Sequence, residues 1–367
     1  MDHTNLQVVG WVAAALITAM LVALITTPVV RTLAIRMGAV DVPKDSRRMH
    51  DHPIPRMGGL AIFFGFILST ILYVEMTPEL QGMLLGAVII VVLGIFDDIY
   101  ALGAKLKLVV QIVAALVAVL SGNVIEVVSN PNVLSSDLWW ELGWLSVPCT
   151  VLWIVAITNA VNLIDGLDGL ACGVSTISSM TMLVISLVVA DGPVAVIMAA
   201  LAGGCIGFLP YNLNPAKIFM GDTGSTFLGF VLAVMSIQGL FKFYTIISFA
   251  VPFLMLGLPI FDTCFAFVRR IAHGQSPMHP DRSHIHHRLI DMGFTQKQAV
   301  AVLYIISAIL GLCAVVLTTS NALRAMLLLL ALCAAGALSG KIFLNGAEKK
   351  KEESQTGDPD KKEEKEP

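Results

Sequence analysis

The chain has 367 residues, of which 56% are hydrophobic and 13% are charged, and its mean hydropathy is +0.82. A soluble globular domain carries roughly 25% charged residues, so this composition excludes an ordinary soluble protein and favours membrane-embedded helices. The net charge of −3 is small, and no basic stripe with interleaved aromatic residues is present, which argues against a nucleic acid partner.

Apolar runs that can cross a membrane, which takes about 20 residues in a helix, recur along the chain. They predict an all-α, polytopic membrane bundle of about eleven helices, at 11–35, 57–74, 82–96, 106–120, 145–161, 170–190, 194–209, 227–240, 246–268, 299–318 and 322–344. We expect one membrane-embedded domain over 1–345. Residues 346–367 are nearly all charged or polar, which predicts a disordered tail.

Basic residues gather on one side of this predicted bundle. Of the 23 Lys and Arg residues, only Lys242 and Arg324 fall clearly on the opposite side. Basic loops remain in the cytoplasm, so we expect the N-terminus outside and the tail inside the cell membrane. The predicted cytoplasmic loops are 36–56, 97–105, 162–169, 210–226 and 269–298.

The first polar cluster is Asp97-Asp98, directly after an apolar run. Carboxylates are costly at a helix centre, so the pair should lie at a helix end and face water or a cation. Two close carboxylates raise the pKa of one of them, which can poise it as a base. A simple helix-end stop is the alternative.

The second cluster runs from Asn159 through Asn162, Asp165 and Asp168 to Gly169. Asn159 and Asn162 share a helix face because they are three residues apart. Gly166 and Gly169 allow a tight turn that directs the two aspartates at a ligand. A plain polar connection is the alternative.

The third cluster is 219–225, in which glycines flank Asp222 and let the backbone approach a phosphate or a metal closely. Asp222 precedes an apolar helix, so a helix N-cap is an equally open interpretation.

The fourth cluster is 280–287, Pro-Asp-Arg-Ser-His-Ile-His-His, in the longest predicted cytoplasmic loop. Three histidines can indicate a transition metal, but the nearby carboxylates and amides suit a hard cation such as magnesium. Because several arginines lie close by, and arginine grips phosphate through two donors, anion binding is favoured. A structural histidine cluster is the alternative.

Carboxylates for a divalent cation and cationic groups for phosphate together indicate a magnesium-dependent phosphoryl or phosphosugar transferase. At these residues the sequence resembles the polyprenyl-phosphate N-acetylhexosamine-1-phosphate transferase superfamily. The matching stretches keep the family's order along the chain, and they are Pro55 to Gly59, Asp97-Asp98, Asn159 to Gly169, Phe219 to Ser225 and His284 to His287.

The resemblance implies transfer of a sugar-1-phosphate from a UDP-sugar to undecaprenyl phosphate with release of UMP. It implies Mg²⁺ as cofactor, with Mn²⁺ as an alternative ion, and a homodimer in the bacterial cell membrane with its active site on the cytoplasmic face. The spacing of His284, His286 and His287 resembles the branch that uses UDP-N-acetylglucosamine to begin teichoic acid, O-antigen or related glycans. The muramoyl-pentapeptide branch carries three adjacent histidines, and it remains the alternative.

The resemblance also implies roles for single residues. Asp97, Asp98 and His284 match catalytic positions, and Asp222 and Asn162 match metal-binding positions. Nucleotide-sugar positions are matched by Asn159, Asp165, Asp168, Asn212 and Phe219, and phosphate positions by Lys107, Arg270, Arg282, His286 and His287. The chain departs from relatives that extend the pair to Asp-Asp-x-x-Asp, because Ala101 stands at the fifth position.

A membrane transporter is the competing class, because ionisable residues in membrane proteins often mark ion pathways. Most polar clusters here lie in loops on one face, whereas transporters place such residues near the membrane centre. Asp262 is the exception, since it falls inside the ninth predicted span. Two roles are open for it, support of the site or binding of lipid phosphate, and a pore lined by Asp262 would favour a transporter.

Overall fold

The computed structural model describes residues 3–43, 52–129, 139–241, 250–272, 274 and 284–319, and these are almost entirely helical. The elements are α1 (His3–Arg36), β1 (Val40–Asp41), β2 (Ile54–Pro55), α2 (Gly59–Tyr73), α3 (Pro78–Tyr100), α4 (Ala104–Leu120), β3 (Val127–Ser129), β4 (Trp139–Glu141), η1 (Gly143–Leu145), α5 (Ser146–Leu163), α6 (Leu170–Val188), α7 (Gly192–Asn212), α8 (Gly221–Ser236), the π-helix η2 (Ile237–Phe241), α9 (Ala250–Met255), α10 (Gly257–Ala272), α11 (Ile285–Asp291) and α12 (Gln296–Thr319). The strands form two short antiparallel pairs, β1–β2 and β3–β4.

The described helices confirm an all-α, multi-pass membrane protein. Six of them are long and apolar enough to cross a membrane, and α2 is a shorter apolar helix. Each predicted span up to 299–318 coincides with a described helix or pair of helices. The last predicted span, 322–344, and the tail lie outside the described residues, so the total of eleven helices stays a prediction.

The ninth predicted span, 246–268, was wrong as a single helix, because α9 ends at Met255 and α10 begins at Gly257. Pro259 has no backbone N–H, so it cannot bond to the carbonyl of Met255 four residues earlier. The hydroxyl of Ser178 on α6 donates to that carbonyl at 2.9 Å instead. The break therefore has a local cause and a partner that satisfies it.

Helix α8 is the centre of the bundle. Every side chain from Thr223 to Ser236 is buried, and the helix packs against α2, α3 and α5. The neighbours approach its backbone closely: a Cβ added to Gly59 would lie 2.0 Å from Gly224 Cα, and one on Gly94 would lie 2.3 Å from Thr223 Cα. Small residues at such contacts are typical of membrane helices, whose association depends on close packing.

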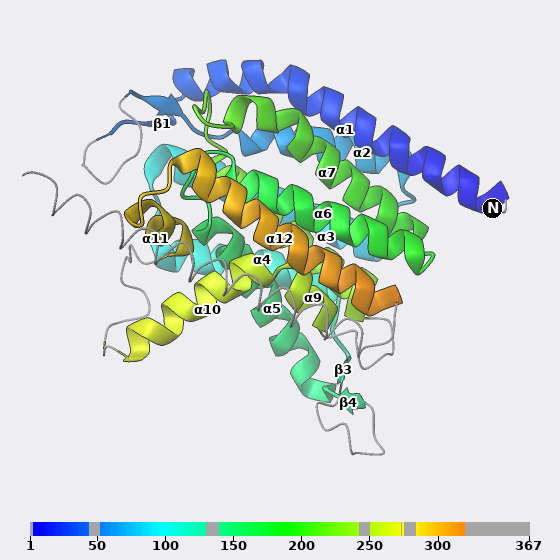
Figure 1. Cartoon of the computed structure of the whole chain (residues 1–367). Helices are drawn as coiled ribbons and strands as arrows, with labels where there is room; N and C mark the ends of the chain where they lie inside the picture. Colours follow the sequence, from blue (N-terminus) through cyan, green and yellow to red (C-terminus); the bar gives the residue numbers. More distant parts are fainter. Residues whose placement is uncertain are drawn as a thin grey trace, which may run out of the picture. The chain divides into compact units, whose positions relative to one another are not determined.

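The first helix lies alongside α2 and α7 (Figure 1). Its contact face is a stripe of buried alanines, Ala15, Ala19 and Ala23. On α7, a Cβ added to Gly203 or Gly207 would lie 2.2 Å from a carbonyl oxygen of α1. Both sides of this contact are therefore made of small residues, which again brings two backbones close together.

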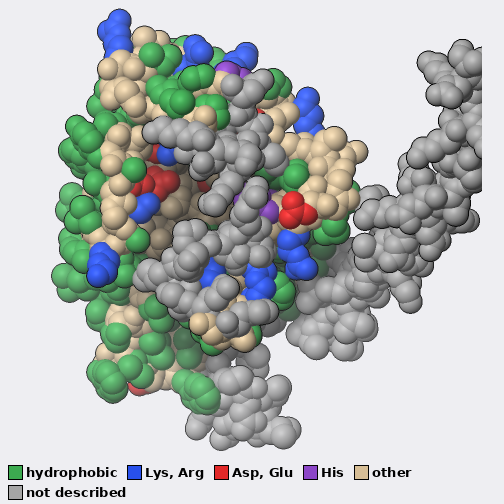
Figure 2. All heavy atoms as spheres, turned by 90° about the vertical axis from the view of Figure 1, so that its left-hand side faces the viewer, with side chains coloured by type: hydrophobic (Ala, Val, Ile, Leu, Met, Phe, Trp, Pro, Cys, Tyr) green, Lys and Arg blue, Asp and Glu red, His purple; other side chains and the backbone are tan. Residues whose placement is uncertain are grey.

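Described parts of two loops that the sequence places on one face meet at one end of the bundle. Gly58 N and Gly59 N donate to the carbonyls of Phe219 and Met220, each at 2.9 Å, which joins the loop before α2 to the loop before α8. Figure 1 shows β1 and α11 at the end opposite to the N-terminus. Figure 2 views this end and shows acidic and basic side chains gathered around a hollow.

We predict that Gly94→Ala destabilises the protein, because the new methyl group would meet the backbone of Thr223 rather than a movable side chain. Overpacking of this kind costs about 1–3 kcal/mol. Thermal unfolding followed by tryptophan fluorescence in detergent micelles should show a lower midpoint. The matched control is Gly10→Ala on α1, where nothing lies within 4 Å of the added Cβ. Equal midpoints for the two variants would contradict the packing argument.

Candidate active site

The end of α3 and the beginning of α8 form the base of the site. Helix α3 ends because Ala101 adopts a left-handed conformation with φ 51°, and its N–H donates to the carbonyl of Asp97 at 2.8 Å. Asp97 and Asp98 therefore occupy the last helical turn, not the loop after it, and both are buried. The Leu102 N–H also donates to Asp97 Oδ1 at 2.7 Å.

Asp98 binds the N-terminus of α8. Its Oδ1 accepts the N–H of Asp222 at 3.0 Å, and its Oδ2 accepts the N–H and hydroxyl of Thr223 at 3.1 and 2.6 Å. A carboxylate is favoured at a helix N-terminus, where backbone N–H groups lack partners within the helix. Through these contacts Asp98 anchors the N-terminus of α8. A catalytic role for Asp98 stays a prediction.

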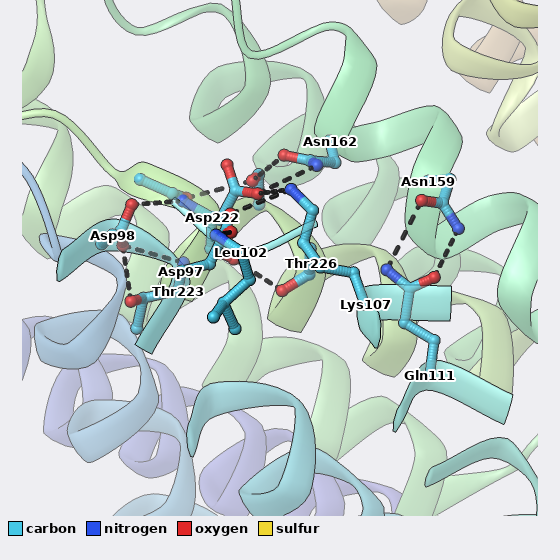
Figure 3. A network of polar contacts seen from close by, with 12 residues as sticks. Asp97, Asp98, Leu102, Lys107, Gln111, Asn159, Asn162, Asp222, Thr223 and Thr226 are labelled. Carbon is cyan, nitrogen blue, oxygen red and sulfur yellow. Dashed lines mark hydrogen bonds and ion pairs between the residues drawn. The ribbon is translucent and has the colours of Figure 1, made fainter. Parts of the chain in front are cut away.

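Lys107 joins the two other carboxylates. Its Nζ lies 2.9 Å from Asp97 Oδ2 and 2.9 Å from Asp222 Oδ2, so one ammonium bridges α3 and α8 from α4 (Figure 3). Asp222 lies in the first turn of α8, whose N-cap is Met220, so the N-cap interpretation of Asp222 was wrong. Its side chain points instead into the network of Lys107 and Asn162.

Asn162, in the last turn of α5, completes this network. Its Nδ2 lies 3.5 Å from Asp222 Oδ2, and its Oδ1 accepts the hydroxyl of Ser225 at 2.7 Å. The structure thus brings together the predicted metal-binding pair and the predicted phosphate-binding lysine from three helices.

The donor set fits a hard divalent cation that arrives with a phosphate. Mg²⁺ is usually bound through one or two carboxylates, water and substrate phosphates, which the oxygens of Asp222 and Asn162 can complement. Within the described ranges, no three His, Cys, Asp or Glu side chains are grouped so as to hold a metal by themselves. Because Lys107 already supplies a positive charge here, a second cation is favoured only together with negatively charged substrate.

Asn159, one turn before Asn162 on α5, pairs with Gln111 on α4. Asn159 Nδ2 donates to Gln111 Oε1 at 2.7 Å and to the Val155 carbonyl at 2.8 Å (Figure 3). Gln111 was not predicted as a site residue, although a buried amide inside an apolar helix is a signal that could have found it. The Asn159 amide therefore joins α5 to α4. The predicted contact of Asn159 with the nucleotide-sugar stays a prediction.

Asp165 lies in the turn between α5 and α6 with an unusual charge environment. Burial, and next the charges of Asp222 and Asp98, raise the pKa of this carboxyl to about 8, and Arg56 partly offsets them. Arg56 belongs to the 55–59 stretch but was not among the predicted site residues. It also pairs with Asp41 at 3.1 Å, which attaches it to β1.

The remaining predicted nucleotide-sugar residues shape the loop before α8. Asp168 Oδ2 accepts Asn214 Nδ2 at 2.9 Å and the Ala216 N–H at 3.0 Å, and Asn212 Nδ2 donates to the Ile218 carbonyl at 3.1 Å. The N–H of Phe219 donates to the Pro55 carbonyl at 2.8 Å. The contacts of Asp168 and Asn212 are thus those of a polar connection that shapes the loop. Stacking of the half-buried Phe219 ring on uracil stays a prediction.

The histidines lie on and before the short helix α11. His284 and His286 are buried, and a Cβ on Gly166 would lie 2.3 Å from His286 Nε2, so this segment packs on the turn after α5. Burial, and next the neighbouring His287, lower the pKa of His286 to about 4. His286 is therefore uncharged at neutral pH, which supports a structural part for this member of the cluster.

The predicted phosphate-binding arginines are only partly described. Arg270 is half-buried in the last turn of α10, and Arg282 lies outside the described residues. Asp262, on the same helix as Arg270, is buried and contacts His284.

Comparison with known proteins identifies the family of the chain. A family model described as glycosyl transferase family 4 matches residues 80–240, which run from α3 to η2. It is 45% identical, over 84% of this chain and 86% of the relative, to a probable undecaprenyl-phosphate N-acetylglucosaminyl 1-phosphate transferase of Bacillus subtilis. The chain belongs to glycosyl transferase family 4.

Two further relatives carry related names. A decaprenyl-phosphate N-acetylglucosaminephosphotransferase of Mycolicibacterium smegmatis is 35% identical over 79% of this chain and 78% of the relative. An undecaprenyl-phosphate alpha-N-acetylglucosaminyl 1-phosphate transferase of Yersinia pestis is 29% identical over 78% of this chain and 79% of the relative. The family resemblance inferred from five motifs is therefore confirmed, and this family member is an enzyme of the transferase class.

We predict that Asp165→Asn raises the thermal unfolding midpoint, and does so more at pH 8 than at pH 5. In the unfolded chain this carboxyl ionises near its ordinary value of 3.8, whereas in the folded protein it keeps its proton up to a pKa of about 8. Between these values the unfolded state binds fewer protons, so wild-type stability falls as pH rises. Asparagine removes this loss. An equal shift of the midpoint at both pH values would contradict the charge argument.

Proposed function

We propose that this protein transfers N-acetylglucosamine-1-phosphate from UDP-N-acetylglucosamine to undecaprenyl phosphate and releases UMP. The observation that carries the proposal is the network of Asp97, Lys107, Asp222 and Asn162 at the loop end of an apolar bundle. It occurs in a chain with 45% identity to a relative of that name. The product would begin a cell-wall glycan such as teichoic acid or O-antigen.

An apolar groove between α3 and α4 supports a long-chain lipid acceptor. The groove has a volume of about 470 Å³ and ends at Leu102, whose N–H donates to Asp97. Lys107 follows directly after Leu106 of the same lining and supplies a cation for the lipid phosphate. The groove is lined by aliphatic and aromatic side chains alone, namely Val88, Ile89, Val92, Leu93, Phe96, Leu102, Leu106 and Val110.

In the proposed reaction, a phosphate oxygen of the lipid attacks the sugar-bearing phosphorus of the UDP-sugar. The bond from that phosphorus to the bridging oxygen breaks, and UMP leaves with the bridging oxygen. A phosphate monoester has its second pKa near 6, so the nucleophile is already largely ionised at neutral pH. Asp97 would then orient Lys107 and the acceptor, and a strong base is not required.

Positioning and charge would supply most of the rate enhancement. Lys107 and Arg270 would bind phosphate oxygens, and Asp222 and Asn162 would hold the Mg²⁺ ion, or Mn²⁺ in its place. The ion, when bound, would neutralise charge on the pyrophosphate. Asp165 and Phe219 would line the nucleoside pocket, with the Phe219 ring stacking on uracil.

We further propose that the protein lies in the bacterial cell membrane as a homodimer, with the site on the cytoplasmic face. Basic residues concentrate in the loops that meet at the site, and basic loops remain inside the cell. The donor UDP-N-acetylglucosamine would then reach the site from the cytoplasm, and the acceptor would reach it from the membrane.

The alternatives are less well supported. A muramoyl-pentapeptide transferase is disfavoured because Ile285 interrupts the histidine run, and the three relatives described above are named as N-acetylglucosamine-phosphate transferases. A transporter is disfavoured because Asp262, the acidic residue inside the ninth predicted span, is buried against His284.

We predict that purified protein with radiolabelled UDP-N-acetylglucosamine, undecaprenyl phosphate and Mg²⁺ forms labelled lipid and releases UMP. Chelation of the metal should abolish turnover, and tunicamycin should inhibit it. Asp222→Asn should lower kcat by about 10²-fold or more, because the metal loses its carboxylate while Lys107 keeps an oxygen acceptor.

The matched control is Asp191→Asn. Asp191 caps α7 at the end of that helix remote from the site, and asparagine is an equally good cap. Its turnover should equal that of the wild type. Turnover of Asp222→Asn near the wild-type rate would overturn the metal assignment, and formation of a labelled lipid without UMP release would overturn the reaction.

A further inference from the structure

Asp262 is a buried carboxylate that the proposed reaction does not use. It lies in the second turn of α10 with 3% of its surface exposed, and an unpartnered charge is costly at such a buried position. Both of its oxygens have partners from a distant part of the chain. Oδ2 lies 2.8 Å from His284 Nδ1, and Oδ1 accepts the N–H of Ile285 at 2.8 Å.

These contacts bear on which ring nitrogen of His284 carries the hydrogen. With Asp262 as a carboxylate, Oδ2 only accepts hydrogen bonds, and the hydrogen of this 2.8 Å contact then lies on Nδ1 of His284. The other nitrogen, Nε2, is then the one that exchanges a hydrogen bond or a proton with another group. A carboxylate that sets the tautomer of a histidine in this way is a recurring feature of catalytic sites.

No room exists for a substrate group at Asp262 itself. The cavity beside it has a volume of about 10 Å³, which is at the lower limit for one water molecule. It is closed by Ile164, Leu170, Leu258 and Leu303. This cavity is too small for a lipid phosphate, so Asp262 would act on the reaction through the segment of His284 and Ile285 that it holds.

The pair is also connected to the turn that carries Asp165. The rings of His284 and His286 are stacked, with centroids 5.8 Å apart and planes within 7°. His286 Nε2 in turn packs on Gly166, where a Cβ would lie only 2.3 Å away. Asp262 thus attaches α10 to a rigid stack whose other end contacts the turn that follows Asn162.

We infer that Asp262 is a positioning residue, which holds His284 as the Nδ1-protonated tautomer and presents Nε2 to a phosphate of the reacting substrates. The inference rests on the proposed function for the identity of those substrates. The hydrogen-bond arrangement itself does not depend on them. Asp262 acts on the reaction only through His284, and this dependence is what the experiment measures.

The test is a double-mutant cycle of Asp262→Asn and His284→Ala, with kcat and KM measured for UDP-N-acetylglucosamine. The amide of Asp262→Asn would keep an oxygen for the N–H of Ile285, so the segment stays attached, but its Nδ2 would donate to Nδ1 and reverse the tautomer. We expect kcat to fall by about 10²-fold or more with little change in KM. The double variant should be no slower than His284→Ala alone, because both changes remove the same function.

A second measurement needs no turnover. ¹⁵N-histidine spectra of the purified protein, assigned by comparison with His284→Ala, should show Nδ1 protonated in the wild type and Nε2 protonated in Asp262→Asn. The matched control for both measurements is Asp191→Asn, which should retain the wild-type kcat and the wild-type His284 spectrum.

Three outcomes would overturn the inference. They are a wild-type kcat for Asp262→Asn when His284→Ala is slow, losses that multiply in the double variant, and a wild-type spectrum without a proton on Nδ1. Absence of turnover in the wild type would refute the proposed function instead, and the spectrum would still decide the role of Asp262.

Discussion

The structure depends on one buried interaction, the binding of the α8 N-terminus by the Asp98 carboxylate. Two backbone N–H groups and one hydroxyl donate to its two oxygens, which compensates a charge that would be costly to bury alone. The same contacts satisfy N–H groups that a helix cannot pair by itself. Because Asp222 is the second residue of α8, this interaction also sets where the Asp222 side chain lies.

The glycine contacts around α8 belong to the same constraint. Gly59 and Gly94 bring the backbones of α2 and α3 against Gly224 and Thr223, so the anchored turn is enclosed on both sides. In a membrane, helix association gains little from the hydrophobic effect and depends on close packing and hydrogen bonds. The site therefore stands on rigid helix ends, and a small shift of α8 would move Asp222 away from Lys107 and Asn162.

The charges of the site are only partly balanced. One ammonium, that of Lys107, lies between Asp97 and Asp222, while Asp165 keeps its proton because its pKa is about 8. Negative charge is thus in excess close to Lys107, which favours a divalent cation once phosphate is bound. On the other side of the turn after α5, Asp262 and the histidines form a second, separately anchored unit.

The sequence by itself determined the class of protein, most of the helix spans within the described chain and the family. Those features are local, since apolar runs, glycine turns and ordered motifs can be read residue by residue. The motifs also identified residues that lie in one network in the structure, namely Asp97, Lys107, Asn162 and Asp222.

Only the tertiary structure decided which hydrogen-bond donors each carboxylate accepts. Asp98 and Asp168 accept backbone N–H groups, and Asp222 is not an N-cap. The ninth span breaks before Pro259, where the hydroxyl of Ser178 on another helix donates to the carbonyl that proline leaves without a partner. Partners of this kind lie 46 to 125 residues away, and a linear pattern contains no information on which distant N–H or hydroxyl will fill a given position.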